Sequence, residues 1–267
     1  MRTHAVELDG GLTLTVEEEG EGPPFLLLHA GVSERHMWDP QWRWLPSRFR
    51  AVRWDWRGYG DTPHVPGPYS YAADVVRVLD ALGIERATLM GCSFAGGVEI
   101  QVAIEHPDRV ERLVVVGTGL PGFEAKEPPE VERLFAQMGD AFAREDVETA
   151  LGLAERLWLV GPRRSAADVD AGYLGRAREL LWRSDRPDNG ATFADADWSA
   201  IGRLGEIRAP TLVVVGDEDV PGIIEACERL AAEVPNVRFE RIAGAAHLPN
   251  LERPQAFDAI LRDWLGP

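Results

Sequence analysis

The residue with the clearest potential for covalent chemistry is Ser93, which stands between an apolar run and a helical pattern. Segment 89–97 reads LMGCSFAGG, so the serine follows a strand-like stretch and is surrounded by small residues. A serine hydroxyl is a poor nucleophile unless a base takes its proton, and the base needs an acid to fix its tautomer. Ser93 therefore predicts acyl transfer, provided that a histidine and a carboxylate reach it.

The serine segment resembles the nucleophile elbow of the α/β-hydrolase fold, whose motif is G-x-S-x-G. The serine of that turn has a strained backbone, so the positions two before and two after it must be small. Gly91 and Ala95 occupy these positions, with alanine in place of the second glycine. The resemblance spans most of residues 1–120 and 208–267. It implies a serine hydrolase similar to 3-oxoadipate enol-lactonases and small carboxylesterases.

The same resemblance implies the partners of Ser93. Segment 244–254 reads GAAHLPNLERP, follows a strand-like run at 237–242, and is similar to the catalytic-histidine loop of the family, which assigns the base to His247. Segment 211–219 reads TLVVVGDED, and the usual family spacing of three residues past the glycine favours Asp219 as the acid, with Asp217 as the alternative. The order serine, aspartate, histidine is the one expected of this fold.

Acyl transfer also needs hydrogen-bond donors for the negative oxygen that forms in the transition state. One donor is expected to be the backbone N–H of Phe94, because free N–H groups at a helix N-terminus favour negative charge. The second is expected from segment 29–32, HAGV, which resembles the His-Gly oxyanion loop of the family with alanine replacing the glycine. The position implies Gly31 as the donor, with Val32 as an alternative.

Two further segments resemble the family without carrying catalytic residues. Segment 55–62, DWRGYGDT, is similar to the motif D-x-R-G-x-G-x-S and is interpreted as structural, because an arginine and a carboxylate can hold a tight turn by charge-assisted hydrogen bonds. Segment 36–39 resembles the helix start after the oxyanion loop. Trp38 in this segment is expected to pack under or beside the substrate pocket.

The order of apolar runs and helical patterns predicts a doubly wound α/β fold with a mostly parallel sheet. Residues 6–8 and 12–16 flank a glycine turn and predict an antiparallel hairpin. Helical patterns occupy 71–82 and 94–105 and end at a glycine and a proline. Segment 121–204 has helical periodicity and is interpreted as an inserted cap on a core of residues 1–120 and 205–267. Buried strands are predicted at 25–28, 51–54, 87–90, 113–116 and 211–215.

Composition narrows the choice of partners and compartment. The chain of 267 residues fits one large α/β domain, and its formal charge of -16 disfavours nucleic acids and anionic membranes. Neither a signal peptide nor an apolar run of membrane-spanning length occurs, and the two cysteines do not suggest a disulfide framework, so a cytoplasmic protein is expected. No metal-ligand spacing or phosphate loop is seen, so no metal or cofactor is expected. No pattern indicates an oligomeric state.

The substrate is expected to be a small ester or lactone, and the pocket residues to come largely from the cap. Large apolar side chains of segment 121–204 are candidates, although packing between cap and core is the commoner role of any one of them. The same triad also serves C–C bond hydrolases and perhydrolases, and the fold also serves ligand receptors with little turnover. Candidate lining residues are Val32, Trp38, Phe123, Met138, Trp158, Trp182 and Trp198.

Overall fold

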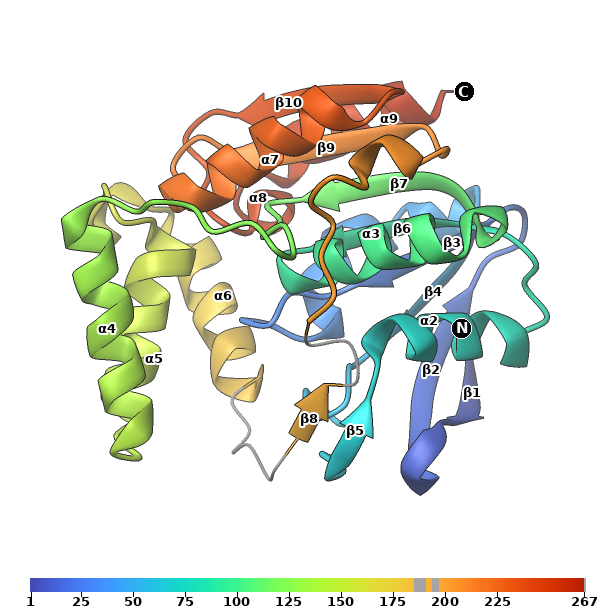
Figure 1. Ribbon diagram of the computed structural model, residues 1–267, viewed down its shortest axis with the longest axis horizontal. Coiled ribbons are helices and arrows are strands. Elements are labelled where there is room, and N and C mark those ends of the chain that lie inside the picture. The colour runs from blue at the N-terminus through green and yellow to red at the C-terminus, as the bar shows by residue number, and fades with distance from the viewer. Residues whose placement is uncertain (185–190, 194–196, 267) are drawn as a thin grey trace.

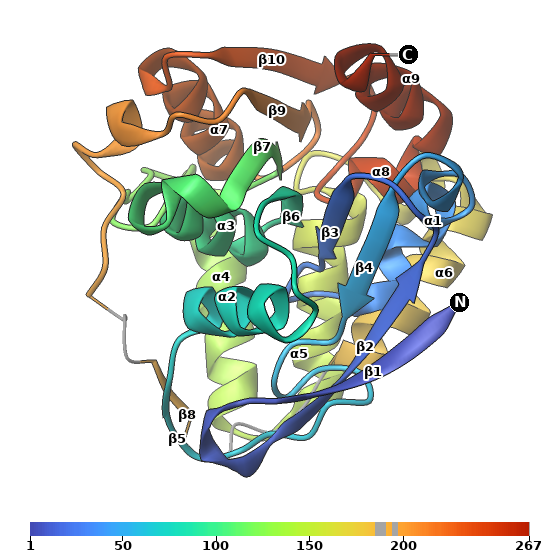
Figure 2. The same cartoon turned by 90° about the vertical axis from the view of Figure 1, so that its right-hand side faces the viewer.

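A twisted central sheet organises the chain, which the computed structural model describes over residues 1–184, 191–193 and 197–266. Within these residues the sheet has eight strands in the order β1-β2-β4-β3-β6-β7-β9-β10, with β10 at one edge and the β1–β2 hairpin at the other (Figures 1 and 2). The strands are β1 (Arg2–Glu7), β2 (Thr13–Glu19), β3 (Pro24–Leu28), β4 (Arg50–Trp54), β6 (Ala87–Cys92), β7 (Val110–Val116), β9 (Thr211–Gly216) and β10 (Val237–Ile242).

The pairing of the strands confirms the predicted mixed sheet. The hairpin β1–β2 is antiparallel, and β2 also runs antiparallel to β4. All the other pairs in this sheet, from β4–β3 to β9–β10, are parallel. Strands buried on both faces tolerate continuous apolar runs, and β9, with TLVVVG, is buried at every position.

Alternate side chains of β3, β4, β6, β7 and β9 divide between two hydrophobic clusters, one on each face of the sheet. In β3, Leu26 and Leu28 belong to the first cluster, whereas Phe25 and Leu27 belong to the second. Helices α2 (Tyr71–Ala81), α3 (Phe94–Glu105) and α7 (Pro221–Glu233) pack on the first face. Residues of α1 (Asp39–Trp42), α8 (Pro249–Glu252) and α9 (Pro254–Leu265) cover the second.

The segment between β7 and β9 contains several helices. It also contains one strand, which the sequence analysis did not predict. Helices α4 (Pro129–Ala143), α5 (Val147–Ala154) and α6 (Ala171–Ser184) lie together beyond one end of the sheet, and a π-helix (Glu155–Val160) continues α5 (Figure 1). Strand β8 (Ala191–Phe193) pairs in parallel with β5 (Gly67–Tyr69). A three-residue strand is too short to produce a recognisable alternation, which explains why it was missed.

Short helical turns occupy several of the connections. The 3-10 turns are η1 (Asp9–Gly11), η2 (Arg35–Trp38), η3 (Leu45–Ser47), η4 (Pro107–Arg109), η6 (Ala166–Asp168) and η7 (Leu204–Glu206). The loops after β3, β6, β9 and β10 all leave the carboxyl ends of parallel strands. In open α/β sheets ligands bind at this edge, so residues far apart in sequence meet there.

Candidate active site

Ser93 occupies the sharp turn that joins β6 to α3. Its backbone has φ 62° and ψ -127°, a left-handed conformation that is strained for a residue with a side chain. A Cβ atom added at Gly91 would lie 2.8 Å from the carbonyl carbon and oxygen of Ala95, so the strand and the helix can approach only because residue 91 is glycine. The methyl group of Ala95 is accommodated in the core. The predicted strained turn is thus present.

Three side chains from separate loops form one hydrogen-bonded line. The Nε2 atom of His247 lies 2.8 Å from Oγ of Ser93, and its Nδ1 atom lies 2.9 Å and 3.1 Å from the two carboxylate oxygens of Asp219. The carboxylate accepts a hydrogen bond from Nδ1–H, which leaves the Nε2 lone pair free to accept a hydrogen bond from the serine hydroxyl. His247 and Asp219 are completely buried, whereas Ser93 is partly exposed. Only the nucleophile end of the line is open to a substrate.

The geometry distinguishes the two candidate acids. Asp219 faces the imidazole and also accepts the backbone N–H of Val220 at 2.7 Å, which orients its carboxylate. Asp217 instead accepts the backbone N–H of Gly244 at 2.7 Å, at the start of the histidine loop. Asp217 therefore positions the loop that carries His247, and Asp219 contacts the histidine itself.

A buried ion pair holds the histidine loop to the inserted segment. The Glu252 carboxylate accepts the backbone N–H of Ala246 at 2.7 Å and pairs with the Arg164 guanidinium at 2.9 Å. Arg164 also donates to the carbonyl oxygens of Val160 and Gly244. Removing one partner of such a buried pair typically costs about 3–5 kcal/mol. The position of the base thus depends on a residue of the insertion, Arg164, and on a residue of the core, Glu252.

Trp158, a predicted pocket residue, lies directly on the histidine. Its ring centroid is 4.5 Å from that of the His247 imidazole, and its carbonyl oxygen accepts the His247 backbone N–H at 3.2 Å. The Phe135 ring also packs against Trp158, with the two ring centroids 5.6 Å apart. Trp158 belongs to the π-helix, a rare conformation that is frequent at functional sites. Val32 and Met138 border the same hydrophobic cluster as Trp158.

Other predicted lining residues lie elsewhere. Trp38 is completely buried and packs against Phe257, so it has no surface with which to line a pocket. Phe123 packs against the first core cluster with the guanidinium of Arg229 over its ring at 5.2 Å.

The other two tryptophans among the predicted lining residues are Trp182 and Trp198. Trp182 on α6 is 49% exposed. Trp198 borders the first cluster beneath Arg203, whose guanidinium carbon lies 5.9 Å from the ring centroid. The helical pattern of the sequence could not indicate which of these tryptophan side chains point toward the triad.

The loop after β3 is locked to the end of β4 through His29. The backbone N–H of Trp56 donates to His29 Nε2 at 3.0 Å, so the other ring nitrogen, Nδ1, carries the proton that it donates to the Ala30 carbonyl at 2.9 Å. The Trp56 indole donates to the His29 carbonyl at 3.0 Å. Burial lowers the pKa of His29, which keeps the imidazole neutral. His29 is therefore a structural residue of the oxyanion loop.

The two residues predicted to supply the oxyanion donors contact one another through the Phe94 ring. A Cβ atom added at Gly31 would lie 3.3 Å from the Phe94 ring. Within the described residues no protein acceptor is found for the backbone N–H of Gly31 or of Phe94, and the same holds for Val32. Gly31 and Phe94 thus stay the predicted donors, with Val32 as the alternative.

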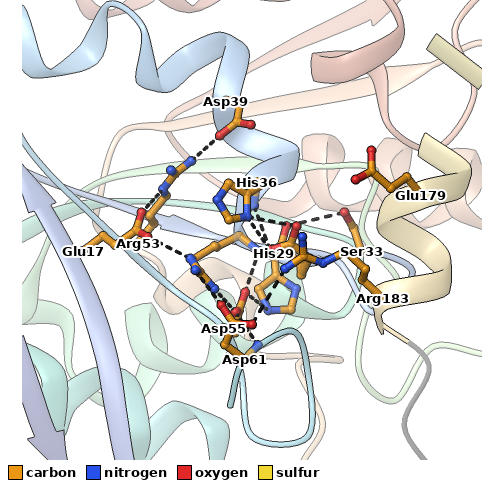
Figure 3. A network of polar contacts seen from close by, with 12 residues as sticks. Glu17, His29, Ser33, His36, Asp39, Arg53, Asp55, Asp61, Glu179 and Arg183 are labelled. Atoms are coloured by element: carbon orange, nitrogen blue, oxygen red, sulfur yellow. Dashed lines mark hydrogen bonds and ion pairs between the residues drawn. The ribbon is translucent and has the colours of Figure 1, made fainter. Parts of the chain in front are cut away.

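A network of ion pairs lies beside His29, at the start of this loop (Figure 3). The backbone N–H of Arg35 donates to Asp55 at 2.8 Å, and its guanidinium contacts Asp55, Glu17 and Asp61. These carboxylates come from two parts of the chain distant from Arg35 in sequence, β2 and segment 55–62, which is why sequence reasoning missed the network. Segment 55–62 was expected to be held by its own arginine and carboxylate, but Asp55 pairs with Arg35, which lies outside the segment.

The arginine of that segment has another partner. Arg57 makes a two-pronged contact with the Asp74 carboxylate on α2, at 2.6 Å and 2.7 Å, and donates to the Asp9 carbonyl at 2.8 Å. These charge-assisted bonds connect the segment to the hairpin and to α2. The motif arginine therefore fixes the loop through neighbouring elements.

In the part of the chain that is described, no group of three or more His, Cys, Asp or Glu side chains is arranged to hold a metal ion. None of the helices there is both long and apolar enough to cross a bilayer.

A parallel-stranded α/β fold, a serine on a strained strand-to-helix turn and a histidine–aspartate pair define the class of α/β hydrolases. Residues 23–254 match the family described as alpha/beta hydrolase fold, and the chain belongs to that family. The resemblance expected from the elbow and histidine loop is thereby confirmed.

Particular relatives span almost the whole chain. A putative carbamate hydrolase RutD from a Caulobacter species is 29% identical over 248 residues, covering 90% of each chain. A thermophilic esterase from Thermogutta terrifontis is 25% identical with a TM-score of 0.81, covering 99% of this chain and 98% of that one. Est816, described as an N-acyl homoserine lactone degrading enzyme, is 28% identical with a TM-score of 0.75, covering 97% and 99%.

Proposed function

We propose that the protein is a serine hydrolase that cleaves a small ester or lactone through an acyl-enzyme. The observation that carries the proposal is the hydrogen-bonded line from Ser93 through His247 to Asp219, with 2.8 Å between Oγ and Nε2. Relatives at 25–29% identity whose names include an esterase and a lactone-degrading enzyme support the substrate class. The formal charge of -16 favours a neutral substrate over a polyanion.

The reaction would begin with attack of the Ser93 oxygen on the substrate carbonyl carbon, as His247 takes the hydroxyl proton on Nε2. The backbone N–H groups of Gly31 and Phe94 would donate to the resulting oxyanion. Asp219 would stabilise the imidazolium without accepting its proton. Collapse of the intermediate breaks the bond between the carbonyl carbon and the oxygen of the leaving alcohol, and His247 gives its proton to that oxygen.

Water would complete the cycle. His247 removes a proton from a water molecule, which attacks the acyl carbon on Ser93. As the bond between that carbon and Oγ of Ser93 breaks, His247 returns the proton to Oγ, and the carboxylic acid leaves the free serine. In a lactone the leaving alcohol stays attached to the acyl chain, so the product is one hydroxy acid. Val32, Met138 and Trp158, which border one cluster beside the triad, would form the wall against which the acyl chain packs.

The test combines labelling with turnover. A fluorophosphonate probe should label Ser93 in the wild type and in Ser165→Ala, an exposed-serine control, but should not label Ser93→Ala. Hydrolysis of p-nitrophenyl acetate and of a panel of lactones should fall on the order of 10⁴-fold or more in Ser93→Ala. Labelling at another serine, or turnover that persists in Ser93→Ala, would refute the proposal. A receptor would show negligible turnover in both proteins.

A further inference from the structure

Tyr59 lies between the two loops that carry the predicted oxyanion donors. Its ring stacks on that of Phe94, with centroids 6.0 Å apart and an interplanar angle of 17°. The Tyr59 ring also meets the His29 imidazole edge-on, with ring centroids 5.3 Å apart. At its tip, the hydroxyl oxygen lies 3.5 Å from the position of a Cβ atom added at Gly31. Tyr59 therefore reaches the oxyanion loop from the side of segment 55–62.

The Tyr59 hydroxyl differs from those of the other tyrosines. The chain has four tyrosines, and the Tyr173 hydroxyl donates to the Leu159 carbonyl at 3.1 Å, while those of Tyr69 and Tyr71 lie 3.5 Å from one another. For the Tyr59 hydroxyl, by contrast, no hydrogen-bond partner is found in the described part of the chain, and the side chain is only partly buried.

Aromatic packing also prepares this hydroxyl to donate. Burial raises the pKa of Tyr59 to about 12, so that the group is a neutral O–H at any ordinary assay pH. Rings on two sides limit the movement of the side chain, and a donor that is already in position needs no reorganisation as charge develops on the substrate. A fixed, accessible O–H beside Gly31 is thus suited to a negative oxygen.

We propose that Tyr59 is a third donor of the oxyanion hole, with its hydroxyl hydrogen-bonded to the substrate carbonyl oxygen alongside the N–H groups of Gly31 and Phe94. This inference rests on the proposed ester or lactone hydrolysis. The bond strengthens as the carbonyl oxygen becomes an alkoxide, so it lowers the barrier more than it tightens substrate binding. Tyr59 would then act on kcat with little effect on KM.

The test is Tyr59→Phe, which keeps the ring and removes the oxygen. With p-nitrophenyl acetate, kcat should fall about 10- to 100-fold, somewhat less than for loss of a main oxyanion donor, while KM stays within about twofold. Tyr69→Phe is the matched control, because it removes a hydroxyl from the same aromatic cluster. Its kcat should stay within about twofold of the wild type.

A transition-state analogue separates donation from a merely structural effect. The inhibition constant of a trifluoromethyl ketone, which forms an oxyanion on Ser93, should rise in Tyr59→Phe by the same factor as kcat/KM falls. An unchanged kcat, a change in KM alone, or an unchanged inhibition constant would overturn the role of Tyr59 while leaving the proposed function intact. A wild type without turnover or labelling at Ser93 would overturn both.

Discussion

Glu99 is a buried acid that should make the stability of this protein depend on pH. The side chain, on α3, is completely buried, and within the described residues neither carboxyl oxygen has a hydrogen-bond partner. Its Cδ atom lies 3.0 Å from the position of a Cβ added at Gly91, beneath the nucleophile turn. Burial raises the pKa of Glu99 well above the usual 4.5 and outweighs the opposite effect of the Gly91 backbone. The folded protein therefore holds the Glu99 proton to a higher pH than the unfolded chain does.

The sign of the effect follows from which state holds the proton. Above pH 4.5 the unfolded chain releases the Glu99 proton and the folded chain keeps it, so the free energy of unfolding falls as the pH rises. The slope is about 1.4 kcal/mol per pH unit for as long as the folded carboxyl stays protonated. Glu99→Gln has nearly the same shape and cannot ionise. While the folded carboxyl stays protonated, the variant should thus gain on the wild type by about 1.4 kcal/mol for each unit above pH 4.5.

Urea denaturation of both proteins at several pH values from 5 to 8 measures this difference. The exposed Glu105 on the same helix supplies the control, because Glu105→Gln should leave the pH dependence of the wild type unchanged. If the unfolding free energies of Glu99→Gln and the wild type differ by the same amount at every pH, Glu99 does not stay protonated in the folded protein, and the reasoning is refuted.

Two further predictions concern the turn and the histidine. Gly91→Ala should lower the free energy of unfolding by about 1–3 kcal/mol, because the new methyl group meets helix backbone at 2.8 Å. Gly139→Ala on α4, with open space around it, should raise the free energy of unfolding by about 0.5–1 kcal/mol. Equal effects of the two substitutions in thermal unfolding would contradict this prediction. Trp158→Leu should reduce kcat about 10-fold, because His247 loses the ring that packs against it. Trp182→Leu, at an exposed position, should retain the wild-type kcat. Equal kcat values for the two variants would show that the Trp158 ring does not position the base.

Local patterns predicted most of the fold. The apolar runs at 25–28, 51–54, 87–90, 113–116 and 211–215 all became strands of the sheet, because a segment buried on both faces must be apolar throughout. Helix α3 starts and ends where the serine segment and the following proline predicted. The strain at Ser93 was also predictable, since it follows from small neighbours in the sequence. Such features depend on contacts within a few residues of one another.

By itself, then, the sequence determined the strands, the sharp turn and the short set of residue types available for chemistry. Tertiary structure decided which of them meet. It directed Asp219 toward His247 and Asp217 toward the histidine loop, although the two carboxylates are only two residues apart. It also placed Trp158 on the imidazole and Tyr59 beside Gly31. The physical reason is that these contacts join loops from different strands, and their distances depend on how the whole sheet twists and packs.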